Sequence, residues 1–417
     1  MSVVINRKSQ CIGNQLFAER RLWFLWTLCL FLVTPAAVFG TIRAREKTYT
    51  PEKRQEIRAK IDKQEEAAAE FEEKKERVEK YLAKVAEEPD WLYSRLPMNW
   101  DTHYEQAIFK NRRVVGGEGH APVPTPRING AHYRRTFKKY HTRISPEGMR
   151  PYNDKNGKVW LCNKETGEYE WAKWAEIDRM PENLMNRISP IVRDAAYIYW
   201  LTGEEKYAEL AAPVVWTYLR GMAFLKPPRN NGICGLTATQ TFEEGHYMGK
   251  LIRAYIFLYD YIKAREDMDR RLIERGIKNY ADQMCRNGIG GMHNWNQMQT
   301  GHILHALSAL EDNDAYADGK GHSYYMDVVL KAHKMKPQDK SALNRYGNWR
   351  QTGVLKVVED WCPDTGLHPE HGGYGFGVPL QILGAVEDMP NEKPSDAAYA
   401  IFNHPRLQQN VFSQYYL

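Results

Sequence analysis

The sequence predicts an all-α fold, an (α/α) toroid built from helical hairpins. From residue 183 onward, apolar residues recur with the period of a buried helix face, and the first such set is Ile188, Ile191, Val192, Ala195 and Ile198. Short loops without an alternating strand pattern separate these helices, so stacked hairpins that close on themselves are the natural packing. No repeat recurs at a fixed sequence period, which disfavours a regular solenoid.

The composition bounds the size of the protein and the charge of its partners. A chain of 417 residues with 43% hydrophobic and 26% charged residues is ordinary for a globular protein of one to three domains. Aromatic residues make up 12% of the chain, which fits a carbohydrate cleft and equally fits ordinary aromatic packing. The net charge of +6 favours an anionic ligand and is too small to predict nucleic-acid binding.

The N-terminal part predicts a targeting segment followed by an arm. Residues 22–33 form an apolar run behind a pair of arginines, and small residues follow it as far as Gly40. Residues 1–40 are therefore interpreted as a signal peptide, with an uncleaved anchor as the alternative, and the protein as exported to the periplasm or secreted. Residues 41–90 are rich in Glu, Lys, Arg and Ala and predict a charged helical arm. Residues 91–417 are the predicted toroid catalytic domain.

Turn residues and helix-ending residues divide the rest of the chain. Residues 151–174 alternate turn signals with short aromatic runs, which predicts a small hairpin. Gly203 is the expected C-cap of the first long helix. Further helices are expected over residues 207–225, 241–262, 268–284, 296–310, 324–333 and 340–360.

Two polar segments carry the predicted chemistry. The first is His293-Asn294-Trp295-Asn296-Gln297, and the second is Glu370-His371-Gly372-Gly373-Tyr374-Gly375-Phe376-Gly377. Side-chain amides can neutralise a carboxylate by hydrogen bonding, as an oxyanion site does. A tyrosine held between glycines can approach a bound chain closely and move a proton. Together the two segments indicate chemistry on an acidic sugar.

These two segments, with the small-residue helix between them, resemble the heparinase II/III-like polysaccharide lyases. That family has an Asn-Asn-Trp-Asn-Gln type segment and, later, a Pro-Glu-Gly-x-x-Tyr-Trp-x-Tyr-Gly type segment. The junction at residues 201–208 is also similar, and the resemblance covers residues 150–417. It implies an (α/α) toroid followed by an antiparallel β-sandwich domain. The β-sandwich is expected to be missing from this chain, and Gly375 stands where the family commonly has Trp.

The resemblance and the residue chemistry both lead to β-elimination. A uronic acid loses its C5 proton and the oxygen at C4 leaves, so the site needs a group that neutralises the carboxylate, a base and an acid. Asn294 and Asn296 are the candidate neutralisers, and a helix N-cap is the alternative for each. Tyr374 is the candidate proton carrier, with packing in a glycine-rich turn as its alternative. Its ordinary pKa near 10 must be lowered by neighbouring positive charge.

Supporting roles fall to residues around these three. His293 and His246 are further catalytic candidates, and a structural hydrogen-bonding role is the alternative for both. Asn296 is joined in substrate binding by three residues, which are Trp295, Glu370 and His371. His302 and His305 lie one helical turn apart but have no evident third ligand, so no metal site is predicted. No cofactor is predicted.

The favoured interpretation is a polysaccharide lyase acting on an anionic, uronic-acid-containing polysaccharide. A non-catalytic glycan-binding remnant, a glycoside hydrolase and a uronyl epimerase on the same toroid stay open as alternatives. A hydrolase requires two carboxylates flanking the scissile bond, and Glu243, Glu244, Asp360, Asp364 and Glu370 form no persuasive pair. Nucleic acid is not an expected partner, and contact with a membrane is expected only through an uncleaved N-terminal anchor.

Overall fold

The computed structural model describes the helical elements of the chain and some of the segments that join them. The described residues are 49–88, 91–99, 109–110, 113–114, 123–124, 139–140, 158–173, 180–225, 235–237, 241–287, 294–331, 333–334, 350–351, 353–361 and 403–413. All of them belong to one compact unit, Arg43–Leu417. Eleven α-helices account for most of these residues and the strands among them are short, which confirms a mostly helical protein.

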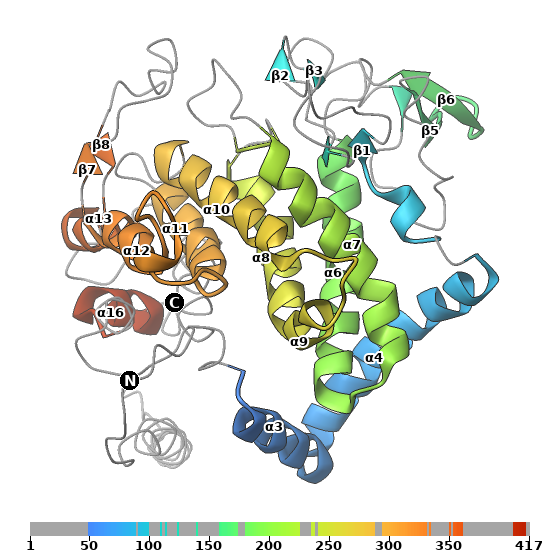
Figure 1. The fold of residues 1–417 in the computed structure, drawn as a ribbon, viewed down its shortest axis with the longest axis horizontal. Helices are drawn as coiled ribbons and strands as arrows, with labels where there is room; N and C mark the ends of the chain where they lie inside the picture. Colours follow the sequence, from blue (N-terminus) through green and yellow to red (C-terminus); the bar gives the residue numbers. More distant parts are fainter. Residues whose placement is uncertain are drawn as a thin grey trace, which may run out of the picture. The chain divides into compact units, whose positions relative to one another are not determined.

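Seven of the helices alternate between two layers along the sequence (Figure 1). The first layer contains α6 (Met180–Thr202), α8 (Thr241–Phe257), α11 (Asn294–Leu307) and α13 (Val354–Trp361). The second layer contains α7 (Glu205–Phe224), α10 (Arg270–Asn287) and α12 (His322–Leu330). Each helix packs against its neighbours in the same layer and against the next helix of the other layer. Successive helices are therefore stacked as hairpins, as their apolar periodicity predicted.

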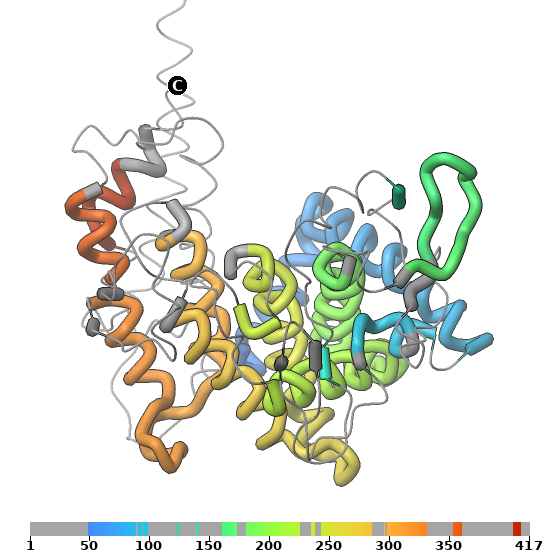
Figure 2. The backbone as a smooth tube through the Cα atoms, turned by 90° about the horizontal axis from the view of Figure 1, so that it is seen from above, coloured from blue at the N-terminus to red at the C-terminus, as the bar shows by residue number. Residues whose placement is uncertain are grey.

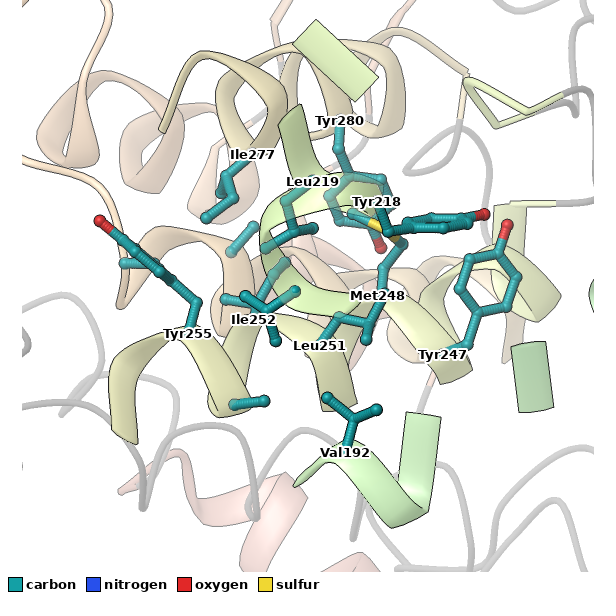
Figure 3. Packing of buried hydrophobic residues seen from close by; sticks show 14 of the residues in the cluster. Val192, Tyr218, Leu219, Tyr247, Met248, Leu251, Ile252, Tyr255, Ile277 and Tyr280 are labelled. Atoms are coloured by element: carbon teal, nitrogen blue, oxygen red, sulfur yellow. The ribbon is translucent and has the colours of Figure 1, made fainter. Parts of the chain in front are cut away.

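The core lies within and between the two layers. Figure 3 shows one part of it, where Leu219, Leu251 and Ile277 come from three different helices and pack beside buried tyrosines. Removing apolar surface from water contributes roughly 25 cal/mol per Å² to folding. The apolar set predicted to face the core of α6 is buried throughout, namely Ile188, Ile191, Val192, Ala195 and Ile198.

Two glycines determine local features of the fold, namely the end of α6 and the close contact between α7 and α10. Gly203 ends α6 with a φ of 80°, and its N–H donates to the Tyr199 carbonyl oxygen at 2.7 Å. This is the C-cap predicted from the sequence. On α10, a Cβ added to Gly276 would lie only 1.9 Å from the Leu219 carbonyl oxygen of α7. The two helices approach as closely as they do because Gly276 has no side chain.

The charged arm consists of two helices, α3 (Pro51–Lys63) and α4 (Glu65–Glu87). Gln64 between them has an extended backbone, which divides the arm into two helices. The charged composition of residues 41–90 does not indicate this break. The arm lies on the main body, because α4 packs against α6 and α7. Val78 and Tyr81 of α4 are buried.

A hairpin precedes the helical layers, as predicted for residues 151–174. Strand β5 (Lys158–Cys162) pairs antiparallel with β6 (Tyr169–Lys173), and the hairpin is the green loop at the upper right of Figure 2. Gly167 in its turn has a φ of 70°, which glycine adopts without strain. The other strand pairs are β1 (Met98–Asn99) with β4 (Val123–Pro124), β2 (Phe109–Lys110) with β3 (Arg113–Val114), and β7 (His333–Lys334) with β8 (Arg350–Gln351).

Two predicted helices differ from the observed helices by more than three residues at one end. The helix expected over residues 241–262 is divided at Leu258 into α8 and the short α9 (Tyr259–Lys263). Its apolar face continues across the division, so periodicity alone does not locate the break. Of the helix expected over residues 340–360, the described part is helical from Val354, where α13 starts, and Arg350 and Gln351 belong to β8 instead. Residues 340–349 lie outside the described residues. One further helix, α16 (Pro405–Ser413), packs against α13 and was not predicted.

Within the described residues, no helix is both long enough and apolar enough to cross a membrane. Residues 1–40 lie outside the described residues, so the signal peptide or anchor stays a prediction.

Candidate functional site

Helix α8 is buried on every side except one. Between Glu243 and Phe257, all side chains are buried apart from four that are partly exposed, and these four are Glu243, His246, Lys250 and Arg253. Their spacing of three, four and three residues places them along one line of the helix. We name this line the α8 stripe. It consists only of titratable and charged residues, which makes it the natural place on α8 to meet a polar ligand.

The stripe meets α11 at a pair of histidines. The rings of His246 and His302 lie edge to face, with centroids 4.9 Å apart and planes at 76°. Gly245 makes this approach possible, because a Cβ at that position would lie 2.1 Å from Cδ2 of His302. One turn further along α8, a Cβ on Gly249 would lie 3.2 Å from Cδ2 of His305. Gly245 and Gly249 of α8 therefore leave the space in which the side chains of His302 and His305 of α11 pack.

Burial sets the charge state of His246. Removal from water lowers the pKa of His246, and the positive charge of Lys250 lowers it further. The ordinary value is 6.5, so the imidazole is neutral at pH 7 and one ring nitrogen carries a lone pair. A neutral, partly exposed imidazole can accept a proton from a ligand. His302 beside it is 6% exposed and is held mostly within the interface.

The stripe meets α6 at a cluster of positive charge. Arg193 donates from Nε and Nη2 to Oδ1 of Asp194, at 2.9 and 2.6 Å. Nη1 of Arg77, from the arm helix α4, lies 3.5 Å from the other carboxylate oxygen of Asp194. The Lys250 ammonium donates to the His246 carbonyl oxygen at 2.8 Å. Burial lowers the pKa of Lys250 to about 8, and the positive charges of Arg193 and Arg253 contribute to this lowering. The negative charge of Asp194 acts in the opposite direction and raises the pKa.

Glu244 follows Glu243 in the sequence but points into the protein. Its side chain is fully buried, and its Oε1 accepts the backbone N–H of Leu236 at 2.9 Å. Its Oε2 accepts from the backbone N–H and the hydroxyl of Thr237, at 2.9 and 2.7 Å. Burial raises the pKa of Glu244 to about 7, although the bonds from Thr237 and Leu236 act in the opposite direction. Glu244 therefore attaches the segment before α8 to the helix and does not face a ligand.

Two tyrosines continue this polar network into the core. The Thr237 and Tyr247 hydroxyl oxygens are 2.9 Å apart. The rings of Tyr247 and Tyr218 are 5.9 Å apart and perpendicular, and Figure 3 shows their hydroxyl groups close together. Burial raises the pKa of both phenols well above 10. Both are therefore neutral, which fits a structural network.

The described structure covers only part of the predicted site. Asn294 and Asn296 are the first and third residues of α11, so neither occupies the position before the helix that an N-cap requires. The Asn296 side chain is fully buried. His246 is partly exposed, as a catalytic candidate must be. The remaining predicted positions lie outside the described residues, either entirely (His293, Glu370, His371 and Tyr374) or in their side chains (Asn294 and Trp295).

The basic residues around the α8 stripe were not predicted from the sequence, and one of the available acids is buried. Glu244 was a candidate hydrolase carboxylate, and its complete burial excludes it from flanking a bond in this structure. Lys250 and Arg253 could have been found with His246, since the three share one helical line. Arg193 and Asp194 could not, because their approach to α8 depends on tertiary packing. Among the described residues, no group of three or more His, Cys, Asp or Glu side chains is placed to hold a metal ion.

Neither a family model nor a curated protein matches this chain.

Proposed function

We propose that the protein is a polysaccharide lyase that cleaves a uronic-acid-containing glycan by β-elimination. The observation that carries the proposal is His246, a neutral and partly exposed imidazole on a stripe that continues into Lys250 and Arg253. β-Elimination on a uronide requires a base beside positive charge or hydrogen-bond donors that receive the carboxylate. The resemblance of the Asn294 and Tyr374 segments to heparinase II/III-like lyases favours the same reaction.

The proposed reaction uses one base and one acid. His246 takes the C5 proton, and the electrons of the C5–H bond form the double bond between C4 and C5. The bond from C4 to the bridging oxygen breaks, and Tyr374 donates a proton to that oxygen. Asn294 hydrogen bonds to the substrate carboxylate, where negative charge builds up as the proton leaves. The products are an unsaturated uronide and a new chain end carrying a hydroxyl group.

The arrangement of the helices supports the architecture that this reaction needs. Helices of the two layers alternate from α6 to α13, which is the hairpin order of an (α/α) toroid. We infer that the layers curve into a toroid with α6, α8 and α11 on its inner side. Export to the periplasm or the exterior, where polysaccharides are met, belongs to the same proposal.

Two exposed aromatic side chains fit a carbohydrate ligand. Tyr169 and Trp171 are the large hydrophobic side chains that stand exposed in the described part of the chain, at 40% and 38%. They are two residues apart on β6, and therefore lie on the same face of the hairpin. A flat aromatic ring can stack on the C–H face of a sugar.

The alternatives differ in products that can be measured. A hydrolase is disfavoured on α8, because Glu244 is buried and cannot pair with Glu243 across a bond. An epimerase exchanges the C5 hydrogen with solvent without cleaving the chain. A glycan-binding protein without activity binds and does neither.

The experiment is incubation of the full chain with a panel of uronic glycans, followed by ultraviolet absorbance of unsaturated chain ends. We expect absorbance to rise with one class of glycan, and to stay at background for His246→Gln and Tyr374→Phe, which retain binding. His322→Gln is the matched control, because His322 hydrogen bonds to the Leu307 carbonyl oxygen at 2.9 Å and does not belong to the α8 stripe. Reducing ends without unsaturation identify a hydrolase, and deuterium uptake without cleavage identifies an epimerase.

A further inference from the structure

We propose that His302 is a positioning residue, whose buried ring on α11 holds the imidazole of His246 in the orientation that accepts a proton from the ligand. The inference rests on the proposed function for the identity of that proton. The contact itself rests on the packing of α8 against α11, and it can be tested without a substrate.

The side chain of His302 lies directly on the backbone of α8. A Cβ added to Gly245 would lie 2.1 Å from Cδ2, 2.2 Å from Cγ and 2.7 Å from Cβ of His302. Glycine inside a helix costs about 1 kcal/mol relative to alanine. At this position the cost is offset by a contact that any larger residue would prevent. The sequence therefore keeps the space beside His246 open for the His302 ring.

The ring of His302 has little room to move. Its side chain is 6% exposed, and α11 packs against α8 along this part of the helix. Its neighbours along α11 are completely buried, namely Thr300, Ile303, Leu304 and Ala306. Closely packed side chains of this kind stay in a single rotamer on the time average. His302 thus presents a fixed surface to whatever lies beside it.

The ring beside it is that of His246. The two centroids are 4.9 Å apart and the planes are at 76°, which is the perpendicular arrangement that ring pairs favour. His246 is partly exposed, so its imidazole has one side against a fixed ring and another open to a ligand. A proton acceptor works only within hydrogen-bond reach of its proton. Because His302 is itself buried, it acts through His246 and does not receive the proton.

The same contact keeps water away from one side of His246. Burial is the largest cause that lowers the pKa of His246, and the positive charge of Lys250 is the second. Removal of the His302 ring would admit water, so the pKa of His246 should rise toward its ordinary value of 6.5. Among the described residues, the titratable groups that act on this part of α8 from neighbouring helices include Arg193 and Asp194 of α6, Tyr218 of α7, Tyr280 of α10 and His302 of α11.

The test measures how fast diethyl pyrocarbonate modifies His246 in the folded full chain between pH 5 and 8, followed by mass spectrometry of the peptide. The reagent attacks the neutral imidazole, so the midpoint of the pH profile reports the pKa. We expect the midpoint to lie below 6.5 in the parent and to move toward 6.5 in His302→Ala, with a faster limiting rate at high pH. His302→Phe keeps a ring in the same place and should retain the profile of the parent.

A second variant reaches the same contact from α8. Gly245→Ala displaces the His302 ring without changing either histidine, and it should move the midpoint in the same direction as His302→Ala. Gly249→Ala is the matched control, because its Cβ would lie beside His305, one turn further along α8, and the midpoint should not move. A midpoint for His246 that is unchanged in both His302→Ala and Gly245→Ala would overturn the proposal. Equal shifts in His302→Phe and His302→Ala would also overturn it.

Cleavage of a uronic glycan supplies a further arm. His302→Ala should lower kcat roughly tenfold or more, because a displaced base meets its proton less often, while KM stays close to that of the parent. His302→Phe should restore most of kcat. If the parent cleaves no glycan, the lyase proposal fails, whereas the modification profile of His246 still decides whether His302 positions this imidazole.

Discussion

Replacing Glu244 with Gln should change how the stability of the protein depends on pH. Glu244 is fully buried, and its pKa is raised from 4.5 to about 7 in the folded chain. The folded state therefore holds this proton more tightly than the unfolded state does. The stability that results is fully present below pH 4.5, and it is lost as the pH rises toward 7. Gln has no proton to lose, so the variant lacks this dependence.

The size of the effect follows from the shift. One pKa unit corresponds to about 1.4 kcal/mol, so the shift of Glu244 corresponds to roughly 3 kcal/mol. Gln keeps the shape of Glu, but only one of its two terminal atoms is an acceptor oxygen, so its NH₂ group leaves the backbone N–H of either Leu236 or Thr237 without an acceptor. Each buried donor without a partner costs about 1–3 kcal/mol. We therefore expect Glu244→Gln to be less stable than the parent at pH 4.5, and to approach or match it above pH 7.

Urea unfolding followed by circular dichroism at pH 4.5, 5.5, 6.5 and 7.5 measures this difference. The free energy of unfolding of the parent, relative to Glu244→Gln, should fall by about 3 kcal/mol across this range. Glu243→Gln is the matched control, because it removes a neighbouring carboxylate that is partly exposed. If the parent and Glu244→Gln keep a constant difference at all four pH values, the burial of an acid with a raised pKa is refuted.

Two further predictions concern glycines at helix crossings. Ala in place of Gly in a helix gains about 1 kcal/mol, but overpacking costs about 1–3 kcal/mol. Gly245→Ala places a Cβ 2.1 Å from the ring of His302 and should lower the free energy of unfolding. In Gly249→Ala the Cβ lies 3.2 Å from the ring of His305, so the free energy of unfolding should stay unchanged or rise. Gly276→Ala should cost about 3 kcal/mol, because the Cβ would lie 1.9 Å from the Leu219 carbonyl oxygen, a backbone atom that moves only if α7 and α10 separate. Urea unfolding of the three variants measures these changes, and equal stability of Gly245→Ala and Gly249→Ala would contradict the crossing geometry.

The helices were predictable where one physical signal determined them. The apolar period of α6 identified the face that is buried, and Gly203 identified its end, since a left-handed residue after a helix favours glycine. The break at Leu258 was not predictable, because the apolar face continues through it into α9. The start of α13 at Val354 was also not predicted, because the pairing of Arg350 and Gln351 as β8 with β7 depends on tertiary contacts that a local pattern does not contain.

The candidate site was predictable only along single helices. His246 was a candidate from its local sequence, and within the described residues its side chain is partly exposed. The cluster of Arg193, Asp194 and Lys250 joins residues from separate helices, and Arg77 joins it from the arm. A local pattern contains no information about which helices become neighbours. Such contacts have to be read from the packing.

The neighbouring acids of α8 show how helix geometry separates two carboxylates that are adjacent in the sequence. Successive residues of an α-helix point about 100° apart, so Glu243 and Glu244 cannot both face one ligand. Glu244 enters the core and binds the segment before the helix, while Glu243 stays on the partly exposed stripe with His246, Lys250 and Arg253. The stripe then carries one carboxylate, one imidazole and two cations. Glu243 and Glu244 therefore cannot form the pair of carboxylates, one on each side of a scissile bond, that glycoside hydrolysis requires.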